Sequence, residues 1–154
     1  PQSKIQTSVS KLHPFGWSIR DRFLTRGLSY ALSKGENFYQ LLKESRLSVA
    51  TYNSTIYYET LAANFPTVIF FDSNLYEINE EAKIHFNLLE SVGIFHKTPE
   101  SASKFVNSIF DEIDKWWFSK DVQNARIYFC DNLALTSKTY LKDWKFAINK
   151  IIKE

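Results

Sequence analysis

The 154-residue sequence is poor in several residue types that mark whole classes of protein. Its one cysteine, Cys130, cannot form a disulfide within the chain, which excludes a disulfide-stapled secreted scaffold. Four glycines and four prolines are too few for a fibrous or linker-dominated protein. Nineteen basic and 17 acidic side chains leave a net charge of +2, which lacks the basic excess typical of nucleic-acid-binding domains. We therefore expect no nucleic-acid partner.

Long apolar runs are missing as well. No run approaches the ~18 apolar residues that a membrane-spanning helix needs, and residues 1–20 hold no apolar signal-peptide core. Together with the single cysteine, this predicts a cytoplasmic protein without a transmembrane segment. Methionine is absent altogether. Either an initiator methionine was trimmed before Pro1 or the chain is a piece of a longer protein.

Aromatic residues, in contrast, are abundant. Thirteen Phe, eight Tyr and four Trp make up 16% of the chain, and rings of this size can give a short chain a substantial core. Helical spacing assigns most rings from Phe105 to Trp144 to packing. We therefore expect the excess rings, a surface for a missing domain or for an oligomer, in residues 13–39 and around Tyr52, Tyr57 and Tyr58.

The order of the apolar segments predicts a single α/β domain over residues 1–154. Buried strands are predicted at residues 47–51 and 66–71, a short extended link at 94–96, and helices at 36–45, 54–64, 78–92, 98–117, about 120–135 and 138–153. Alternation of strands and helices favours a Rossmann-like three-layer fold with a small parallel sheet and a helical C-terminal tail. Two or three strands make a thin sheet, so further strands either escape recognition or lie upstream of Pro1.

The stretch from residue 47 to residue 72 carries the most chemistry. The first predicted strand ends at Thr51, and Asn53, Ser54 and Thr55 lead into the next helix, with Glu59 about one turn further on. Ligands of open parallel sheets bind beyond the carboxyl ends of the strands, and a helix N-terminus there offers N–H donors and a positive dipole end to a phosphate. The pattern therefore suggests a grip for a nucleoside diphosphate, with the Glu59 carboxylate on the ribose.

A purely structural interpretation stands beside this one. Asn, Ser and Thr are the ordinary N-cap residues of helices, and Glu59 would be equally at home on a solvated helix face. A glycine-rich phosphate loop, which would be more specific, does not occur in the sequence. Asp72 follows the second strand, where it would either contact the donor or cap a turn.

The histidines offer weaker candidates. His13 lies in a loop with Pro14 and Gly16, where it could serve as an acid or base or simply cap a backbone group. His85 lies among apolar helix positions, which favours a satisfied core or boundary histidine. Because the three histidines lack metal-ligand spacing and Cys130 has no partner nearby, we expect neither a metal site nor a cofactor.

Similarity to a known family extends over nearly the whole chain. Residues 51–55 (TYNST) and 59–67 (ETLAANFPT) resemble the nucleotide-sugar half of GT-B glycosyltransferases. More closely, they resemble a family of transferases encoded in O-antigen and surface-polysaccharide gene clusters. Other features that look like the family's are Gly16-Trp17, Arg20, Gly93-Ile94-Phe95-His96, Trp116-Trp117, Val122-Gln123-Asn124-Ala125-Arg126 and Phe129.

This resemblance implies the C-terminal, donor-binding half of a two-domain GT-B enzyme. Ser54 and Thr55 would hold the phosphates of a nucleotide-sugar donor and Glu59 its ribose. The leaving diphosphate would be stabilised without a metal, with Arg20 and Arg22 as candidate charges, although a solvated face would suit both arginines. The N-terminal domain that binds the acceptor is missing, so this chain alone is expected to be inactive. The alternatives are a non-catalytic interaction module and another nucleotide-sugar enzyme, such as an epimerase.

Overall fold

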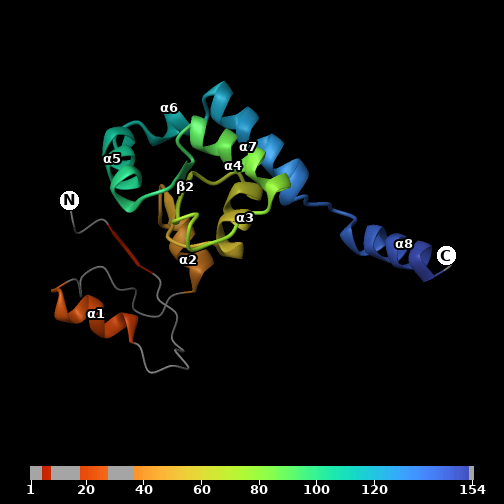
Figure 1. Cartoon of the computed structure of the whole chain (residues 1–154), viewed down its shortest axis with the longest axis horizontal. Helices are drawn as coiled ribbons and strands as arrows, with labels where there is room; N and C mark the ends of the chain where they lie inside the picture. The colour runs from red at the N-terminus through yellow and green to blue at the C-terminus, as the bar shows by residue number, and fades with distance from the viewer. Residues whose placement is uncertain (1–4, 8–17, 28–36, 153–154) are drawn as a thin grey trace. The chain divides into compact units, whose positions relative to one another are not determined.

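The computed structural model describes residues 5–7, 18–27 and 37–152 (Figure 1). The chain divides into two units, Pro1–Ser45 and Arg46–Glu154. The described residues of the first unit form two short helices, α1 (Ile19–Thr25) and α2 (Phe38–Lys43). Each begins at a side-chain cap, because Ser18 Oγ accepts a hydrogen bond from the Asp21 N–H and Asn37 Oδ1 accepts one from the Gln40 N–H.

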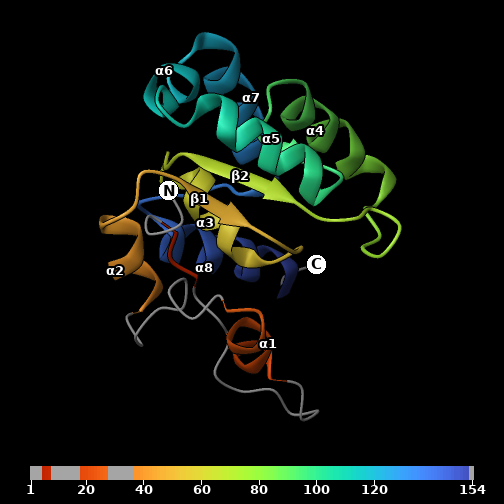
Figure 2. The same ribbon diagram turned by 90° about the vertical axis from the view of Figure 1, so that its left-hand side faces the viewer.

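The second unit is built on a parallel sheet of three strands in the order β1-β2-β3, and Figure 2 shows β1 and β2 side by side. The strands are β1 (Ser48–Ala50), β2 (Thr67–Phe70) and β3 (Phe95–His96), and the register places Ala50 beside Ile69 and Ile69 beside Phe95. This confirms the predicted small parallel sheet. The short extended link predicted at residues 94–96 is extended at Phe95 and His96, but these two residues also pair with β2 as a third strand, which is too short to show a periodicity.

Helices cover both faces of this sheet. Along the chain, α3 (Thr55–Ala62) follows β1 and α4 (Glu80–Ser91) follows β2, and both lie on one side, whereas α5 (Pro99–Ile109) lies on the other (Figure 1). Burial on both faces explains why Thr67, Val68 and Ile69 of β2 are all fully buried. The predicted α/β architecture is thus confirmed.

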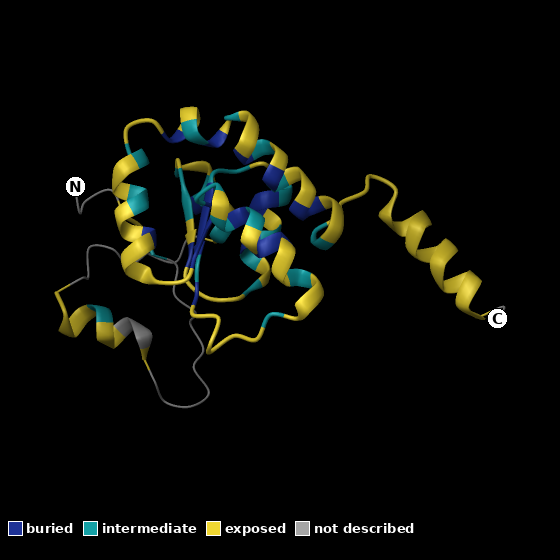
Figure 3. Cartoon of the chain, turned by 45° about the horizontal axis from the view of Figure 1, so that its top comes forward, coloured by how far each residue is buried: buried dark blue, intermediate teal, exposed yellow. Residues whose placement is uncertain are grey.

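The aromatic residues form much of the core between the sheet and its helices. Phe86 of α4 meets Phe71, Phe95 and Phe129 edge to face, with ring centroids 5.7, 5.3 and 5.5 Å apart. Figure 3 shows the buried residues concentrated in the sheet and in the inner sides of the helices. Tyr57 is fully buried in this core, so its predicted place among the surplus surface rings is wrong.

The predicted helix over residues 98–117 is two helices. The chain turns at residues 110–112, between α5 and α6 (Ile113–Trp117), and α7 (Lys120–Leu133) follows. The turn divides the predicted apolar stripe. Helix α5 packs against β2 and β3, whereas α6, with the buried Ile113 and Trp117, packs against α7. In turn, α7 packs against α3 and α4. The predicted packing role of Trp117 is confirmed.

The last helix, α8 (Tyr140–Ile152), contains no buried residue. Its Trp144 is 66% exposed, so the assignment of rings as far as Trp144 to packing is wrong at that position. Periodicity predicted an apolar face correctly but could not tell whether anything covers it. No described helix is long and apolar enough to cross a membrane.

Candidate functional site at the carboxyl edge of the sheet

The three parallel strands bring three loops to one edge of the sheet. From its carboxyl end, β1 leads through residues 51–54 to α3, β2 leads through residues 71–79 to α4, and β3 leads through residues 97–98 to α5. This is the edge at which parallel sheets bind ligands. Five sequence-predicted residues lie in these loops or at the start of α3, namely Thr51, Asn53, Ser54, Thr55 and Asp72.

Ser54 is the N-cap of α3, but its hydroxyl does not cap the helix. Its backbone is extended (φ −145°, ψ 166°), as an N-cap should be, yet its side chain makes no cap hydrogen bond. Its Oγ is buried and has no hydrogen-bond partner among the described residues. A buried hydroxyl without a partner is unfavourable and invites a ligand or water.

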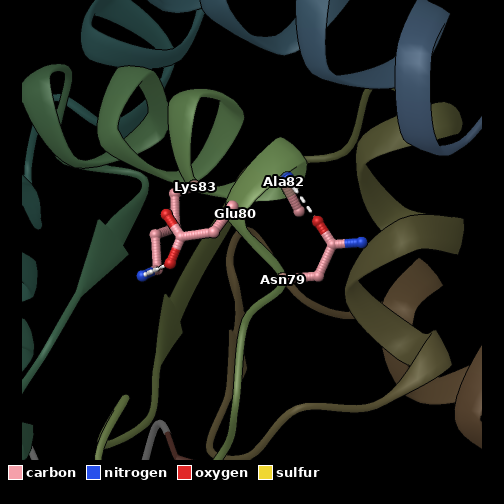
Figure 4. A network of polar contacts seen from close by, with 4 residues as sticks. All are labelled: Asn79, Glu80, Ala82 and Lys83. Atoms are coloured by element: carbon pink, nitrogen blue, oxygen red, sulfur yellow. Dashed lines mark hydrogen bonds and ion pairs between the residues drawn. The ribbon is translucent and has the colours of Figure 1, made fainter.

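The other helices that follow strands start differently. Asn79 Oδ1 accepts a 3.0 Å hydrogen bond from the Ala82 N–H at the start of α4 (Figure 4). Thr98 Oγ1 accepts a 3.1 Å bond from the Ser101 N–H at the start of α5. At α3, in contrast, no cap side chain occupies the N–H groups of the first turn, which form the positive end of the helix dipole.

Asn53 is held in place from inside the core. The Tyr57 hydroxyl donates a 2.6 Å hydrogen bond to Asn53 Oδ1. Burial raises the pKa of Tyr57, so its phenol keeps the donated proton at neutral pH. Because Oδ1 already accepts this bond, the Nδ2 group of the exposed Asn53 side chain is the part that can donate to a ligand.

Glu59 and Thr55 share one face of α3. They are four residues apart, which is about one helical turn, and both are exposed. Thr51, at the end of β1, is exposed too. The structure therefore gathers Thr51, Asn53, Ser54 and Thr55 around the start of α3, with Glu59 one turn along.

Asp72 has a structural role that the sequence left open. Its Oδ1 accepts a 2.8 Å hydrogen bond from the Asn74 N–H, and its carbonyl oxygen accepts bonds from the N–H groups of Leu75 and Tyr76, both at 3.0 Å. The residue therefore caps the turn after β2. It is nevertheless exposed at the same edge as the α3 N-terminus.

Three predicted residues are not placed at this edge by the structure. His13 lies outside the described residues. Arg20 belongs to α1 in the first unit, and its side chain is not described. Arg22, the other candidate for stabilising a diphosphate, is an exposed residue of the same helix.

Acidic residues dominate the described part of this edge. The β2–α4 loop and the first turn of α4 carry four carboxylates, from Asp72, Glu77, Glu80 and Glu81. Lys83 nearby forms an ion pair with Glu80 (Figure 4), and Lys97 after β3 forms one with Glu90 at 2.7 Å. The edge thus offers hydroxyl, amide and backbone donors, but its two lysines are already engaged.

Sequence reasoning missed the residues that fix the opposite end of α3. Trp117 Nε1 donates to the carbonyl oxygen and to Oδ1 of Asn64, at 3.2 and 3.0 Å. Arg126 Nη1 donates to the Leu61 carbonyl oxygen at 3.0 Å, and Gln123 Nε2 donates to the Trp117 carbonyl oxygen at 2.8 Å. Asn64 has φ +54°, the left-handed conformation common just after a helix. The asparagine at the end of the predicted helix was the sequence signal that marked this helix end.

Both described histidines are buried, but only His96 has a hydrogen-bond partner at each ring nitrogen. His96 bonds through Nδ1 to Ser101 Oγ at 2.8 Å and through Nε2 to the Gly93 carbonyl oxygen at 3.0 Å. Burial lowers the pKa of His96. His85 is buried as predicted, but its Nδ1 has no hydrogen-bond partner among the described residues, so the prediction of a satisfied histidine is wrong. Within the described ranges, no three His, Cys, Asp or Glu side chains form a metal-binding group.

Comparison with known proteins gives a match to a protein family. The model of a family described as LIC12162 family transferase matches residues 3–148, nearly the whole chain. No curated protein matches the chain. No solved structure matches it either.

Proposed function

Because the chain belongs to the LIC12162 family of transferases, we propose that it binds the nucleotide-activated donor of a group-transfer reaction. The donor's diphosphate would lie at the N-terminus of α3, beyond the carboxyl end of β1. The observation that carries this assignment is the buried Ser54 hydroxyl, which has no partner among the described residues and does not cap its own helix.

The donors at this end of α3 suit phosphate oxygens. The first-turn N–H groups and the Ser54 and Thr55 hydroxyls can each donate one hydrogen bond, and the helix dipole favours negative charge. Asn53 adds its Nδ2 donor in an orientation that Tyr57 fixes. A phosphate would thereby supply the partner that the Ser54 hydroxyl lacks.

Glu59 would hold the sugar of the nucleotide. A carboxylate only accepts hydrogen bonds, so it suits the two hydroxyls of a ribose rather than a phosphate. Its position one turn after Thr55 on the same helix face would separate the ribose from the diphosphate by about one helical turn, a pitch of about 5.4 Å.

The positive charge that the diphosphate needs must come from elsewhere. The carboxylates at the edge raise the cost of binding an anion, and the two lysines there are paired with Glu80 and Glu90. Arg20 and Arg22 of α1 remain our candidates, and another domain is a second source. Without that charge, transfer would be slow because the helix dipole and the neutral donors alone would leave most of the charge of the departing diphosphate uncompensated.

We assign the reaction as transfer of a sugar or a related group in the assembly of a surface polysaccharide such as O-antigen. The support is the transferase family together with the resemblance of residues 51–67 to the donor half of GT-B glycosyltransferases. In that arrangement an N-terminal domain binds the acceptor, and no metal is required. This chain would supply donor binding alone.

A nucleotide titration tests the proposal directly. UDP, CDP, GDP and ADP are added to the ¹⁵N-labelled chain while its amide resonances are followed. We expect at least one nucleotide to shift the amides of Thr55 and Ile56 in the millimolar range. Ser54→Ala should weaken that binding about tenfold or more, since a hydrogen bond to a charged group contributes about 1.5–3 kcal/mol.

Ser119→Ala is the matched control. Ser119 is also a half-buried N-cap serine without a cap hydrogen bond, but it starts α7, away from the carboxyl edge. This variant should bind like the wild type. If none of the four nucleotides perturbs the start of α3, the donor-site assignment is wrong and a non-catalytic interaction module becomes the better interpretation.

A further inference from the structure

The apolar face of α8 is exposed along its whole length. The helix spans 13 residues, and six large apolar side chains recur at helical spacing on one side of it. Each is 49–75% exposed, and they are Tyr140, Leu141, Trp144, Ile148, Ile151 and Ile152. Water-exposed faces of this size on a helix generally mark an interaction surface.

The charge around this face differs from that of the rest of the unit. Residues 138–154 hold five lysines against one aspartate and one glutamate, whereas residues 46–137 hold seven basic and 12 acidic side chains. The exposed side chains of Lys142, Lys145 and Lys150 lie on the helix itself. The tail is thus a basic amphipathic helix attached to an acidic body.

A basic amphipathic helix with exposed Trp and Tyr residues has the composition of a helix that lies in a membrane interface. Its lysines complement anionic headgroups, its aliphatic side chains enter the acyl boundary, and Trp144 and Tyr140 keep their polar atoms at headgroup level. The acidic body would be repelled by the same surface. Within the second unit, attraction is therefore confined to the tail; residues 1–45, with seven basic and three acidic side chains, would add to it.

The described surface of the unit offers this face a poorer fit. The groove between α4 and α7 is apolar only in part, with four apolar and three polar lining residues, namely Leu88, Val92, Ala125 and Tyr128 against Ser91, Asp121 and Asn124. The helix of a second copy laid there would place large aliphatic side chains against a carboxylate and an amide, which is costly.

We propose that α8 binds the chain peripherally to an anionic lipid bilayer, with the apolar face of the helix in the interface and the lysines against the headgroups. The proposal is independent of the donor site, because it involves none of the residues around α3. It requires no membrane-spanning segment.

Vesicle binding by the full chain tests this. The chain is sedimented with vesicles of an equal mixture of phosphatidylcholine and phosphatidylglycerol, and with vesicles of phosphatidylcholine alone. We expect binding to the mixture, much weaker binding to phosphatidylcholine, and a loss of binding at high salt because salt screens the attraction. Replacing Lys142, Lys145 and Lys150 by Gln should lower the partition coefficient about fivefold for each lysine.

Variants of the apolar face locate the contact. The double substitution Trp144→Asp with Ile148→Asp should abolish binding, while Leu135→Asp, which changes a 78% exposed leucine just before the helix, should not. Because α8 has no buried residue and Leu135 is itself exposed, all three substitutions should leave the melting temperature unchanged. Trp144→Phe should keep binding but remove the blue shift of tryptophan fluorescence that vesicles cause.

Three results would overturn the proposal. One is the absence of binding to the anionic vesicles. Another is binding that the Trp144→Asp and Ile148→Asp pair does not weaken. The third is a dimer that forms without lipid, is dissociated by that same pair and leaves vesicles unbound, which would show that a second copy covers the face.

Discussion

The Tyr57 hydroxyl donates a 2.6 Å hydrogen bond to Asn53 Oδ1, from a fully buried ring to an exposed loop. The two residues are four positions apart, one at the end of the β1–α3 loop and the other in the first turn of α3. This bond links the hydrophobic core to the candidate donor site. It gives the asparagine a fixed orientation that a solvent-exposed loop would not provide.

Removing this hydroxyl should therefore affect both stability and binding. Tyr57→Phe leaves the ring in the core but breaks the bond, and we expect a loss of about 1 kcal/mol in the free energy of unfolding, measured in urea. Nucleotide binding at the start of α3 should weaken as well. Tyr128→Phe, which alters an exposed tyrosine of α7, should do neither. Unchanged nucleotide binding in Tyr57→Phe would show that orienting Asn53 is not important.

Because of the buried Tyr57, the stability of the fold should also depend on pH. Its pKa is raised in the folded protein because burial disfavours the phenolate. The folded state thus holds its proton more tightly than the unfolded state, and stability should fall as the pH rises above about 10, the ordinary pKa of tyrosine. Urea unfolding of the wild type and of Tyr57→Phe across this range should show a steeper decline in the wild type. Parallel curves would exclude this contribution.

Truncation to alanine should change the stability of the fold differently at Ser54 and at Thr98. Thr98→Ala removes a hydroxyl that caps α5 and should cost about 1 kcal/mol of stability. Ser54→Ala removes a buried hydroxyl without a partner among the described residues, so it should be neutral or slightly stabilising. Chemical denaturation of both variants provides the measurement. A clear destabilisation by Ser54→Ala would mean that its hydroxyl serves the fold and would weaken the case for a binding role.

Gly93 should tolerate no side chain. It has φ +79°, and a Cβ there would clash with the Phe105 ring. Gly93→Ala therefore combines backbone strain with a clash, and we expect a loss of about 2 kcal/mol or more in unfolding free energy. Gly27 has φ +70°, but no described atom lies within 4 Å of the place that a Cβ would take there. Gly27→Ala should thus cost only about 1 kcal/mol, and equal losses for the two variants would contradict the packing of Phe105 on Gly93.

Mild acid should destabilise the fold through protonation of His96. Its pKa is lowered chiefly by burial, against opposing effects of the Gly93 carbonyl and the Glu90 charge. The unfolded state therefore binds a proton more readily, and stability should decrease as the pH falls below about 6.5. Melting temperatures between pH 5 and 8, compared with those of His96→Gln, should show a smaller slope for the variant. An identical slope would assign the acid sensitivity to other groups.

Much of the second unit was predictable because its apolar patterns are strong. The β2 strand was expected at residues 66–71 and occupies Thr67–Phe70, since a buried parallel strand is a continuous apolar run bounded by Pro66 and Asp72. The start of α5 was expected from Thr98 and Pro99, and the Thr98 cap is present. The strand β3 and the turn between α5 and α6 were missed, because both depend on what the apolar side chains face.

Only part of the candidate site could be predicted from the sequence. Thr51, Asn53, Ser54, Thr55 and Glu59 could be grouped because they surround one predicted strand–helix junction. The sequence could not show that Ser54 is a cap without a cap bond, or that Asn53 is held by Tyr57, since both depend on side-chain direction. Nor could it show that Trp117 and Arg126, more than 50 residues away, fix the other end of α3.

The sequence by itself determined the fold class and the position of the candidate site, because strand and helix periodicities and the N-cap residues are local properties of the chain. It also determined that the final helix is amphipathic and basic. Only the tertiary structure decided which apolar surfaces are covered. Tyr57 is buried and Trp144 is exposed because burial depends on what packs against a ring, and residues distant in the chain provide that packing.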